Sequence, residues 1–136
     1  MNTTTKEDLY IEAVGRRKTS VARVRLTPAS KRSFIINDKD LNDYFQTSEL
    51  IRIATEGLNC ADSDKTFKVT AKIFGGGIHG QAEALRHAIA RAIVKDNEEL
   101  RKKVKKLGFL KRDPRAKERR KFGLKKARKA PQWSKR

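Results

Sequence analysis

The segment Gly75-Gly76-Gly77-Ile78-His79-Gly80 has the G-x-G-x-x-G spacing of a dinucleotide-binding loop. In such loops the glycines let the backbone approach a phosphate, and the N–H groups at the start of the next helix hold it. The dinucleotide-binding fold also needs a second parallel strand that carries a ribose-binding acid. Here the motif is followed by one predicted helix, then by another helix and a basic tail. The segment does not match a Walker A loop either, because Gln81 and Ala82 occupy the positions where that motif has a lysine and a hydroxyl residue.

Two other readings of this segment stay open. The glycines can simply permit a sharp turn from a strand into a helix. Alternatively, the exposed N–H groups at the helix start can hold a phosphate that belongs to a polymer, which makes Gly75, Gly76 and Gly77 candidate RNA-binding residues. A nucleotide-binding enzyme is kept as a third alternative, testable by saturable binding of a dinucleotide or ATP.

The remaining reactive residue types do not form a recognisable catalytic or metal site. His79 and His87 are eight residues apart, and no nearby cysteine or carboxylate pair completes a metal-binding set. No Ser-His-Asp arrangement can be assembled from the sequence. The single cysteine, Cys60, cannot close an internal disulfide, which fits reducing surroundings. We therefore predict a protein that is not an enzyme and that needs no metal or cofactor.

Positive charge is the most informative feature of the sequence. The 136 residues include 34 Lys and Arg against 16 Asp and Glu, a net charge of +18. Residues 98–136 carry 18 basic and 4 acidic side chains, so this stretch alone holds +14 of the total. So many like charges repel one another unless a polyanion neutralises them. When the cations contact phosphates, counterions are released, and this release favours binding. The composition predicts a near-neutral domain with a polycationic extension that binds nucleic acid.

The extension is predicted to run as an irregular, extended thread. Gly108, Pro114, Gly123 and Pro131 prevent one continuous helix. Phe109, Phe122 and Trp133 offer faces that can stack on bases. The predicted RNA-binding cations are Arg112, Arg115, Arg119, Arg120, Lys121, Lys125, Lys126 and Arg128 in the extension, and Arg16, Arg17, Lys18, Arg23 and Arg25 in the domain. Structured RNA, with its irregular phosphate surface, suits such a thread better than a duplex groove.

Hydrophobic periodicity supplies the elements that would position these cations. Alternation predicts strands over 9–13, 20–26, 34–36 and 66–74, with a hairpin turn or bend at 15–18. Helical spacing predicts helices over 38–45, over 48–57 between a Ser48 N-cap and a Gly57 stop, beyond Gly80, and over 98–107 with Leu107 facing the core. We expect an α+β fold with helices on one face of a mostly antiparallel sheet. The predicted divisions are a flexible N-terminus (1–8), a globular domain (9–110) and an extended tail (111–136).

Four motifs resemble the ribosomal protein S9 family of the small subunit. They are Gly15–Leu26 (GRRKTSVARVRL), Gly75–Ala82 (GGGIHGQA), Arg112–Arg115 (RDPR), and Lys126–Arg128 with Gln132–Arg136 (KAR, QWSKR). The resemblance covers about residue 10 to the last residue. Trp133, where the family usually has Phe or Tyr, and Lys111, where Thr is common, are minor departures.

This resemblance implies a fold like the second domain of ribosomal protein S5, with a left-handed βαβ crossover. It also implies a position in the head of the small subunit, on its ribosomal RNA and beside neighbouring proteins. The tail would run toward the peptidyl site, where Ser134, Lys135 and Arg136 would touch the anticodon arm of transfer RNA.

The cellular location and the strongest competing function follow from the same composition. No apolar run approaches the roughly 20 residues that cross a bilayer, and the N-terminus lacks the apolar block of a signal peptide, so we expect a cytoplasmic protein within the ribosome. The main alternative is a nucleoid protein that coats DNA without sequence preference. Such a protein would bind duplex DNA as well as RNA and form no stoichiometric complex with ribosomal subunits.

Overall fold

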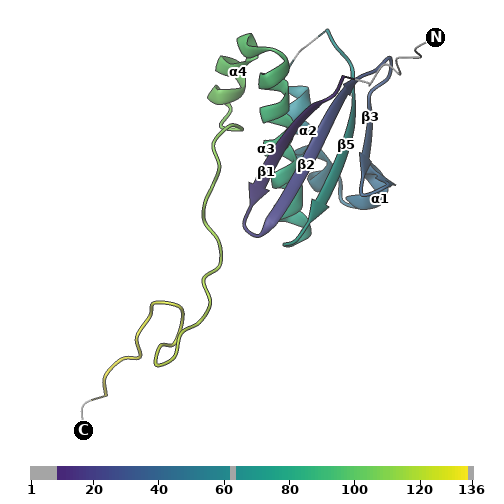
Figure 1. The fold of residues 1–136 in the computed structure, drawn as a ribbon. Coiled ribbons are helices and arrows are strands. Elements are labelled where there is room, and N and C mark those ends of the chain that lie inside the picture. Colours follow the sequence, from purple (N-terminus) through teal and green to yellow (C-terminus); the bar gives the residue numbers. More distant parts are fainter. Residues whose placement is uncertain (1–8, 62–63, 135–136) are drawn as a thin grey trace, which may run out of the picture.

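A computed structural model describes residues 9–61 and 64–134 of the chain. The fold is α+β, with one mixed sheet of five strands in the order β1-β2-β5-β3-β4 (Figure 1). The strands are β1 (Ile11–Arg17), β2 (Ser20–Pro28), β3 (Ser33–Ile36), β4 (Lys39–Asp40) and β5 (Phe67–Phe74). The helices are α1 (Leu41–Tyr44), α2 (Ser48–Asn59), α3 (Ile78–Asp96) and α4 (Arg101–Lys106), with a 3₁₀ turn at Glu98–Leu100 before α4.

The sheet is antiparallel except for one pair of strands. β2 pairs antiparallel with both β1 and β5, and β4 pairs antiparallel with β3. β3 lies parallel to β5, and α1 and α2 connect these two strands along the chain. The turn from β3 to β4 uses Asn37 and Asp38 with φ of 47° and 65°, a conformation that Asn and Asp tolerate better than most residues.

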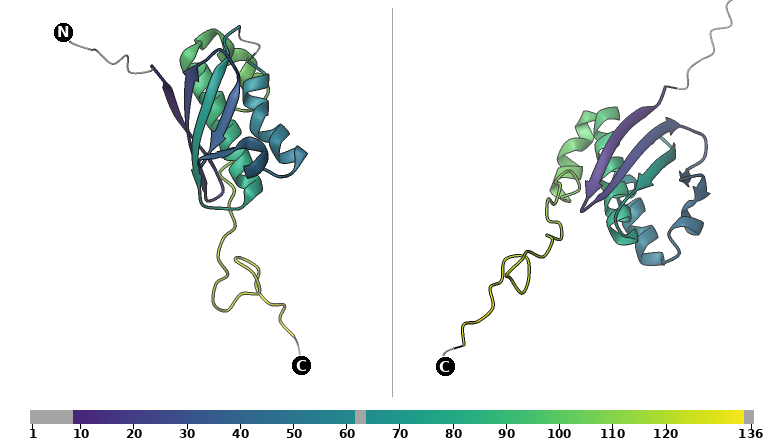
Figure 2. Two further views of the ribbon diagram at one scale, coloured as in Figure 1. Left: turned by 90° about the vertical axis from the view of Figure 1, so that its right-hand side faces the viewer. Right: turned by 60° about the horizontal axis from the view of Figure 1, so that its bottom comes forward.

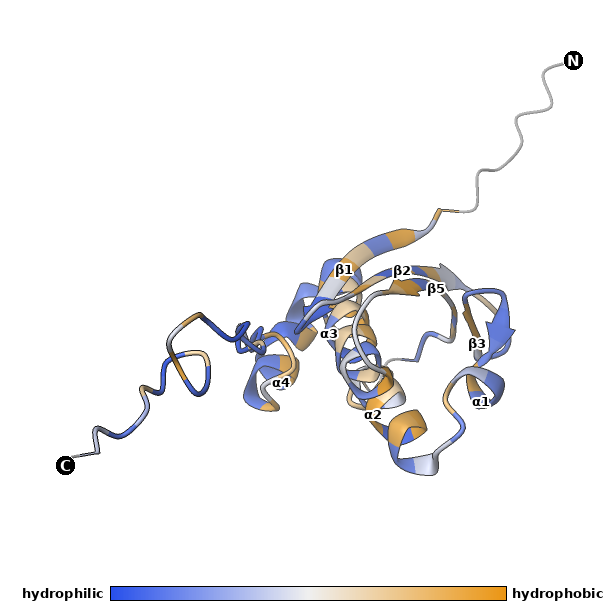
Figure 3. Cartoon of the chain, turned by 90° about the horizontal axis from the view of Figure 1, so that it is seen from below, coloured by the Kyte–Doolittle hydropathy of each residue, from blue (hydrophilic) through white to orange (hydrophobic). Residues whose placement is uncertain are grey.

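Helices cover one face of this sheet and leave the other face open (Figures 2 and 3). On β5, Phe67, Val69, Ala71 and Ile73 are buried while the residues between them are more exposed, as the alternation predicts. α3 packs on β1 and β2 through a face rich in alanine, including Ala84, Ala88 and Ala92, which are fully buried. These small side chains let the helix lie close to the sheet. Because side chains alternate along each strand, the open face displays the polar residues.

Several element boundaries differ from their predictions for identifiable reasons. β1 continues through Gly15, Arg16 and Arg17, so the hairpin turn falls at Lys18 and Thr19 and not over 15–18. α3 begins at Ile78, before Gly80, and Gly80 lies within the helix beside Ser20, where an added Cβ would be 3.1 Å from Oγ. The predicted helix over 38–45 is mostly replaced by β4 and the single turn α1.

The caps predicted for α2 and the core position predicted for Leu107 are wrong. The N-cap of α2 is Thr47, one residue before the predicted Ser48. Gly57 does not end α2, because the helix continues to Asn59 and Gly57 lies against α3, where an added Cβ would be 2.9 Å from the carbonyl oxygen of Arg86. Leu107 follows α4 and is 51% exposed, whereas Val104 is buried as expected.

The chain after α4 leaves the domain as a single thread (Figure 1). Residues 111–134 form neither helix nor strand, and the later part of this segment runs away from the sheet and helices in all three ribbon views (Figures 1 and 2). None of the helices in the described part is long and apolar enough to cross a membrane.

Candidate nucleic-acid interface

The β1–β2 hairpin places three of the predicted cations beside α3. Gly15 lets β1 approach this helix, since an added Cβ would lie 2.1 Å from the carbonyl oxygen of Ala84. Beyond Gly15 the side chains alternate, so Arg16 is exposed and Arg17 points toward the helix side, with only 16% of its side chain exposed. Lys18 occupies the turn with φ of 53° and is exposed. Arg16 and Lys18 are therefore accessible to a ligand, whereas Arg17 is not.

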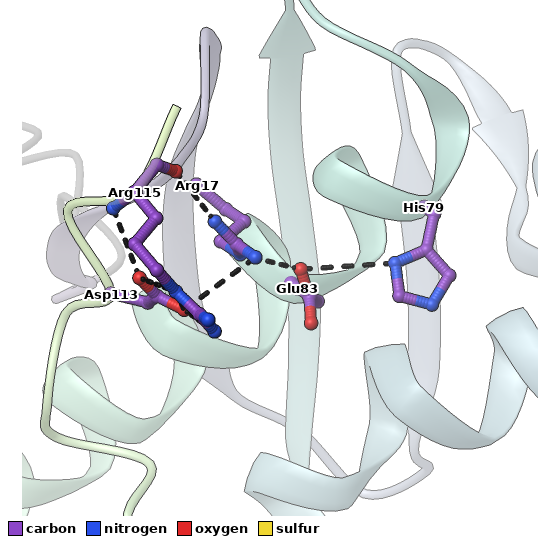
Figure 4. A network of polar contacts seen from close by, with 5 residues as sticks. All are labelled: Arg17, His79, Glu83, Asp113 and Arg115. Carbon is purple, nitrogen blue, oxygen red and sulfur yellow. Dashed lines mark hydrogen bonds and ion pairs between the residues drawn. The ribbon is translucent and has the colours of Figure 1, made fainter. Parts of the chain in front are cut away.

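Arg17 is held by a network of polar contacts that joins the hairpin, α3 and the start of the tail (Figure 4). Its Nε donates to Oε2 of Glu83 at 2.8 Å, and its Nη1 donates to the carbonyl oxygen of Arg115 at 2.9 Å. Its Nη2 lies 3.6 Å from Oδ2 of Asp113, which also accepts from Nη2 of Arg115 at 2.8 Å. We call Arg17, Glu83, Asp113 and Arg115 the tail-root clamp. Hydrogen bonds from the Arg115 side chain and backbone hold the pKa of Asp113 well below its usual range.

The open face of the sheet carries a second group of cations. Arg23 and Arg25 are exposed on β2, as predicted, and both lie near Glu12, whose Oε2 accepts from Nε of Arg25 at 2.9 Å. Lys68 and Lys72 extend this group onto β5, and Lys72 is the direct cross-strand partner of Arg23. Like charges directly opposite each other in a sheet are unfavourable. The open face therefore gains from contact with an anionic partner.

The glycine segment between β5 and α3 is a tight structural turn. Gly75 and Gly76 have φ of 77° and 64°, and a Cβ on Gly76 would lie 2.0 Å from Oγ of Ser20. Gln81, at the position of the Walker A lysine, donates to the carbonyl oxygen of Gly75 at 3.0 Å and accepts from the Tyr44 hydroxyl at 2.7 Å. These contacts account for the segment as a turn. A phosphate contact by Gly75, Gly76 and Gly77 stays a prediction.

The two histidines have separate environments. Nδ1 of His79 lies 3.7 Å from Oε2 of Glu83, and 58% of the His79 side chain is exposed. His87 is partly buried, and its Nδ1 has no hydrogen-bond partner within the described residues. Burial lowers the pKa of His87, and the nearby charge of Arg91 lowers it further. Within residues 9–61 and 64–134, no three His, Cys, Asp or Glu side chains come together as a metal site.

The predicted cations of the tail are almost all exposed. Arg112, Arg115, Arg119, Arg120, Lys125, Lys126 and Arg128 are exposed or nearly so, and Lys121 is partly covered. Glu118 pairs with Lys121 and with Arg128, whose Nε donates to it at 2.8 Å. Phe122 is fully exposed and Trp133 is 79% exposed, so both rings are available for stacking. Ser134 is exposed, while Lys135 and Arg136 lie outside the described residues.

A cavity of about 490 Å³ lies where the tail leaves the domain. We call it the tail-root cavity. It lies between the hairpin, α3 and residues 108–115, and its charged lining consists of Arg16, Arg17, Glu83, Arg86, Lys111, Arg112, Asp113 and Arg115, with His87 and Phe109 beside them. The guanidinium of Arg86 lies 4.9 Å from the ring centre of Phe109 and donates to Oε2 of Glu56 at 2.8 Å. The structure thus gathers cations from positions about 95 residues apart around one space.

The comparison with known families decides among the alternative interpretations of this cationic surface. Residues 15–136 match the family described as ribosomal protein S9/S16. The chain belongs to this family. As a member of the S9/S16 family it is a ribosomal protein of the small subunit, part of a ribonucleoprotein that acts in translation. Members of this family are typically structural and non-enzymatic.

The S9/S16 match includes every cation discussed above and begins at Gly15, inside β1. Sequence reasoning named most of these cations but missed Lys68 and Lys72 on the open face, although their alternation with buried residues was visible. It also missed Glu83, Asp113 and His87, because nothing in the local sequence shows that α3 and the tail root meet at the hairpin.

Proposed function

We propose that this S9/S16 protein is a structural component of the head of the small ribosomal subunit that binds the ribosomal RNA of that subunit through both its domain and its tail. The proposal rests on residues 111–134. This segment forms neither helix nor strand and exposes most of its cations. Such a thread gains order only where phosphates surround it. Residues 9–110 are proposed to be the RNA-anchoring domain and residues 111–136 the penetrating tail, while residues 1–8, predicted as a separate N-terminal segment, lie outside the described residues.

Within the domain, two surfaces are proposed to contact RNA. One is the hairpin with Arg16 and Lys18, and the other is the open face with Arg23 and Arg25, which Lys68 and Lys72 enlarge. Both consist of long cationic side chains that reach phosphates from a rigid sheet. The strands β3 and β5 are parallel neighbours joined by helices, and we also propose that their connection has the left hand that the resemblance to the S5-like fold implies.

The end of the tail is proposed to contact transfer RNA in the peptidyl site. Trp133 would offer a stacking face, and Ser134, Lys135 and Arg136 would bind the backbone of the anticodon arm. Backbone contacts carry no base information, so all elongator transfer RNAs would be held alike. The proposed location is the cytoplasmic ribosome, where neighbouring head proteins are further partners.

Competitive binding tests the central proposal. The full-length protein is mixed with small-subunit ribosomal RNA and with duplex DNA of equal length at several salt concentrations, and binding is measured by filter retention. We expect preference for the ribosomal RNA and stoichiometric cosedimentation with small subunits at moderate salt. Equal affinity for duplex DNA, with no defined stoichiometry, would support the DNA-coating alternative instead.

A further inference from the structure

The cations around the tail-root cavity fall into two groups. Arg17 and Arg115 pair with Asp113, Arg17 also pairs with Glu83, and Arg86 pairs with Glu56. Arg16, Lys111 and Arg112 are exposed, and the described part of the chain provides no carboxylate partner for any of them. Three positive charges around this space are therefore left without an internal counter-charge.

The carboxylates in the cavity lining do not neutralise these three cations. Glu83 accepts from Arg17 and lies near His79, while Asp113 is shared by Arg17 and Arg115. Both acids are thus already engaged in the tail-root clamp. Uncompensated like charges around one space repel each other, and an anion placed among them removes that repulsion.

The clamp also holds the walls of the cavity in place before any ligand arrives. Arg17 binds the carbonyl oxygen of Arg115 at 2.9 Å and Glu83 at 2.8 Å, which ties the tail root to both the hairpin and α3. Lys111 and Arg112 are thereby kept near Arg16, although about 95 residues separate them in sequence. A site whose walls are already positioned loses less entropy when it binds.

We propose that the tail-root cavity binds one phosphate ester of nucleotide size through Arg16, Lys111 and Arg112. Its volume of about 490 Å³ is within the range of small-ligand sites and exceeds the need of a bare phosphate. The two guanidinium groups can each form paired hydrogen bonds to phosphate oxygens, and the ammonium adds a point charge. The inference deepens the proposed function, on which it rests where the ester is a nucleotide of the RNA backbone.

His87 provides a reporter for this site. It lines the cavity, and the chain contains only one other histidine, His79, which is exposed and does not line it. The charge of Arg112 contributes to the lowered pKa of His87. A bound phosphate would counter that charge, so occupancy should shift the imidazole resonances of His87 and raise its pKa, with little change at His79.

The test is an NMR titration of the full-length protein observed at the two histidines. Inorganic phosphate, a nucleoside 5′-monophosphate and a short single-stranded RNA are added separately. We expect a saturable shift of His87 with the two phosphate esters, and an affinity about tenfold lower or worse in the variant Arg16→Gln/Lys111→Gln/Arg112→Gln. The matched control, Lys31→Gln/Lys39→Gln/Arg52→Gln, removes the same charge from exposed positions outside the cavity and outside the proposed RNA-binding surfaces, and should keep most of the affinity. Circular dichroism confirms that both variants are folded.

The outcomes separate this site from general electrostatic attraction. Equal losses in the two triple variants, or a His87 shift that never saturates, would overturn the inference. Saturation by the monophosphate but not by the RNA would support the site and assign it to free nucleotides. RNA binding by filter retention without any His87 response would overturn the inference and leave the proposed function intact. A His87 response to the monophosphate without binding of ribosomal RNA would support the site and contradict the proposed function.

Discussion

Arg16 and Arg17 are neighbours in sequence but have different surroundings. Arg16 is exposed and lines the tail-root cavity, whereas the Arg17 guanidinium is enclosed between α3 and the tail root. Arg17 already donates to Glu83 and to the carbonyl oxygen of Arg115. One cation-rich motif can therefore supply two roles. Arg16 is free to bind a ligand, whereas Arg17 holds the elements around it in position.

Gly76 and Gly77 allow a residue-scale test of the turn before α3. Gly76 has φ of 64°, and its Cβ would meet Ser20, whereas Gly77 has no atom within 4 Å of an added Cβ and is the N-cap of α3. We expect Gly76→Ser to lower the free energy of unfolding by about 2 kcal/mol or more, from positive-φ strain and overlap. Gly77→Ser should be neutral or slightly stabilising, because serine is a good N-cap. Urea unfolding compares the two variants, and equal effects would refute this account of the turn.

The lowered pKa of Asp113 predicts how its contacts at the tail root respond to acid. Its hydrogen bonds with Arg115 hold its pKa well below the usual value of about 3.8. A carboxyl group whose pKa falls on folding gives its full stabilisation above the unfolded-state pKa, and loses it as the pH falls through the folded-state value. The Asp113 contacts should therefore persist at about pH 4 and weaken only in stronger acid. Backbone ¹⁵N relaxation at residues 113–118 measures this, with Asp113→Asn as the control that is mobile at every pH.

At the scale of elements, the first part of the tail belongs to the domain. The tail-root clamp links residues 113 and 115 to the hairpin and to α3, and Arg86 packs over Phe109 just before them. Farther along, the contacts are local, such as those of Glu118 with Lys121 and Arg128. The first residues of the predicted tail, up to Arg115, are therefore tied to the hairpin and to α3, whereas the residues around Glu118 contact one another.

Limited trypsin digestion of the full-length protein tests this boundary. Without RNA, we expect the first cuts at Lys117, Arg119, Arg120 or Lys121, because residues 111–115 are held by the clamp. Arg17→Met removes the clamp while preserving much of the side-chain volume, and should open earlier sites at Lys111 and Arg112. Arg16→Met is the matched control and should digest like the unchanged protein. Early cutting after Lys111 in the unchanged protein, identified by mass spectrometry, would contradict the clamp.

At the scale of the whole molecule, charge and structure are separated along the chain. The folded part buries apolar side chains from β1 to Val104 of α4, and most of the net charge of +18 lies after it. A thread with this charge cannot bury enough apolar surface to fold alone, and it requires a rigid domain to set its direction. The combination suits a protein that is anchored at one place on RNA and reaches another.

Removal of Ser134, Lys135 and Arg136 tests the far end of this reach. We expect subunit assembly to be nearly unchanged, because the domain and most tail cations remain. Binding of transfer RNA in the peptidyl site should weaken by about 1–3 kcal/mol, the scale of one or two charge-assisted hydrogen bonds. Filter binding on purified small subunits measures the dissociation constant. The variant Lys135→Gln/Arg136→Gln separates lost charge from lost length, and an unchanged constant in both would remove the terminal contact.

Much of the fold was predictable because it rests on local patterns. Alternation in residues 20–26 and 66–74 identified two central strands and showed that Arg23 and Arg25 face away from the core. The errors arose where a tertiary contact overrides local preference. The position of Gly57 predicts a helix stop, yet its lack of a side chain serves the close approach of α2 to α3. Gly15 likewise serves the contact of β1 with α3 and not a turn.

The amino-acid order alone specified the α+β class, the segregation of charge into the last 39 residues and the motifs of the S9 family, since these depend on composition and short-range spacing. It could not specify that Arg17 contacts residues 66 and 98 positions away, or that Arg16, Lys111 and Arg112 surround one cavity. Contacts between distant segments depend on the path of the folded chain, which local periodicity does not encode.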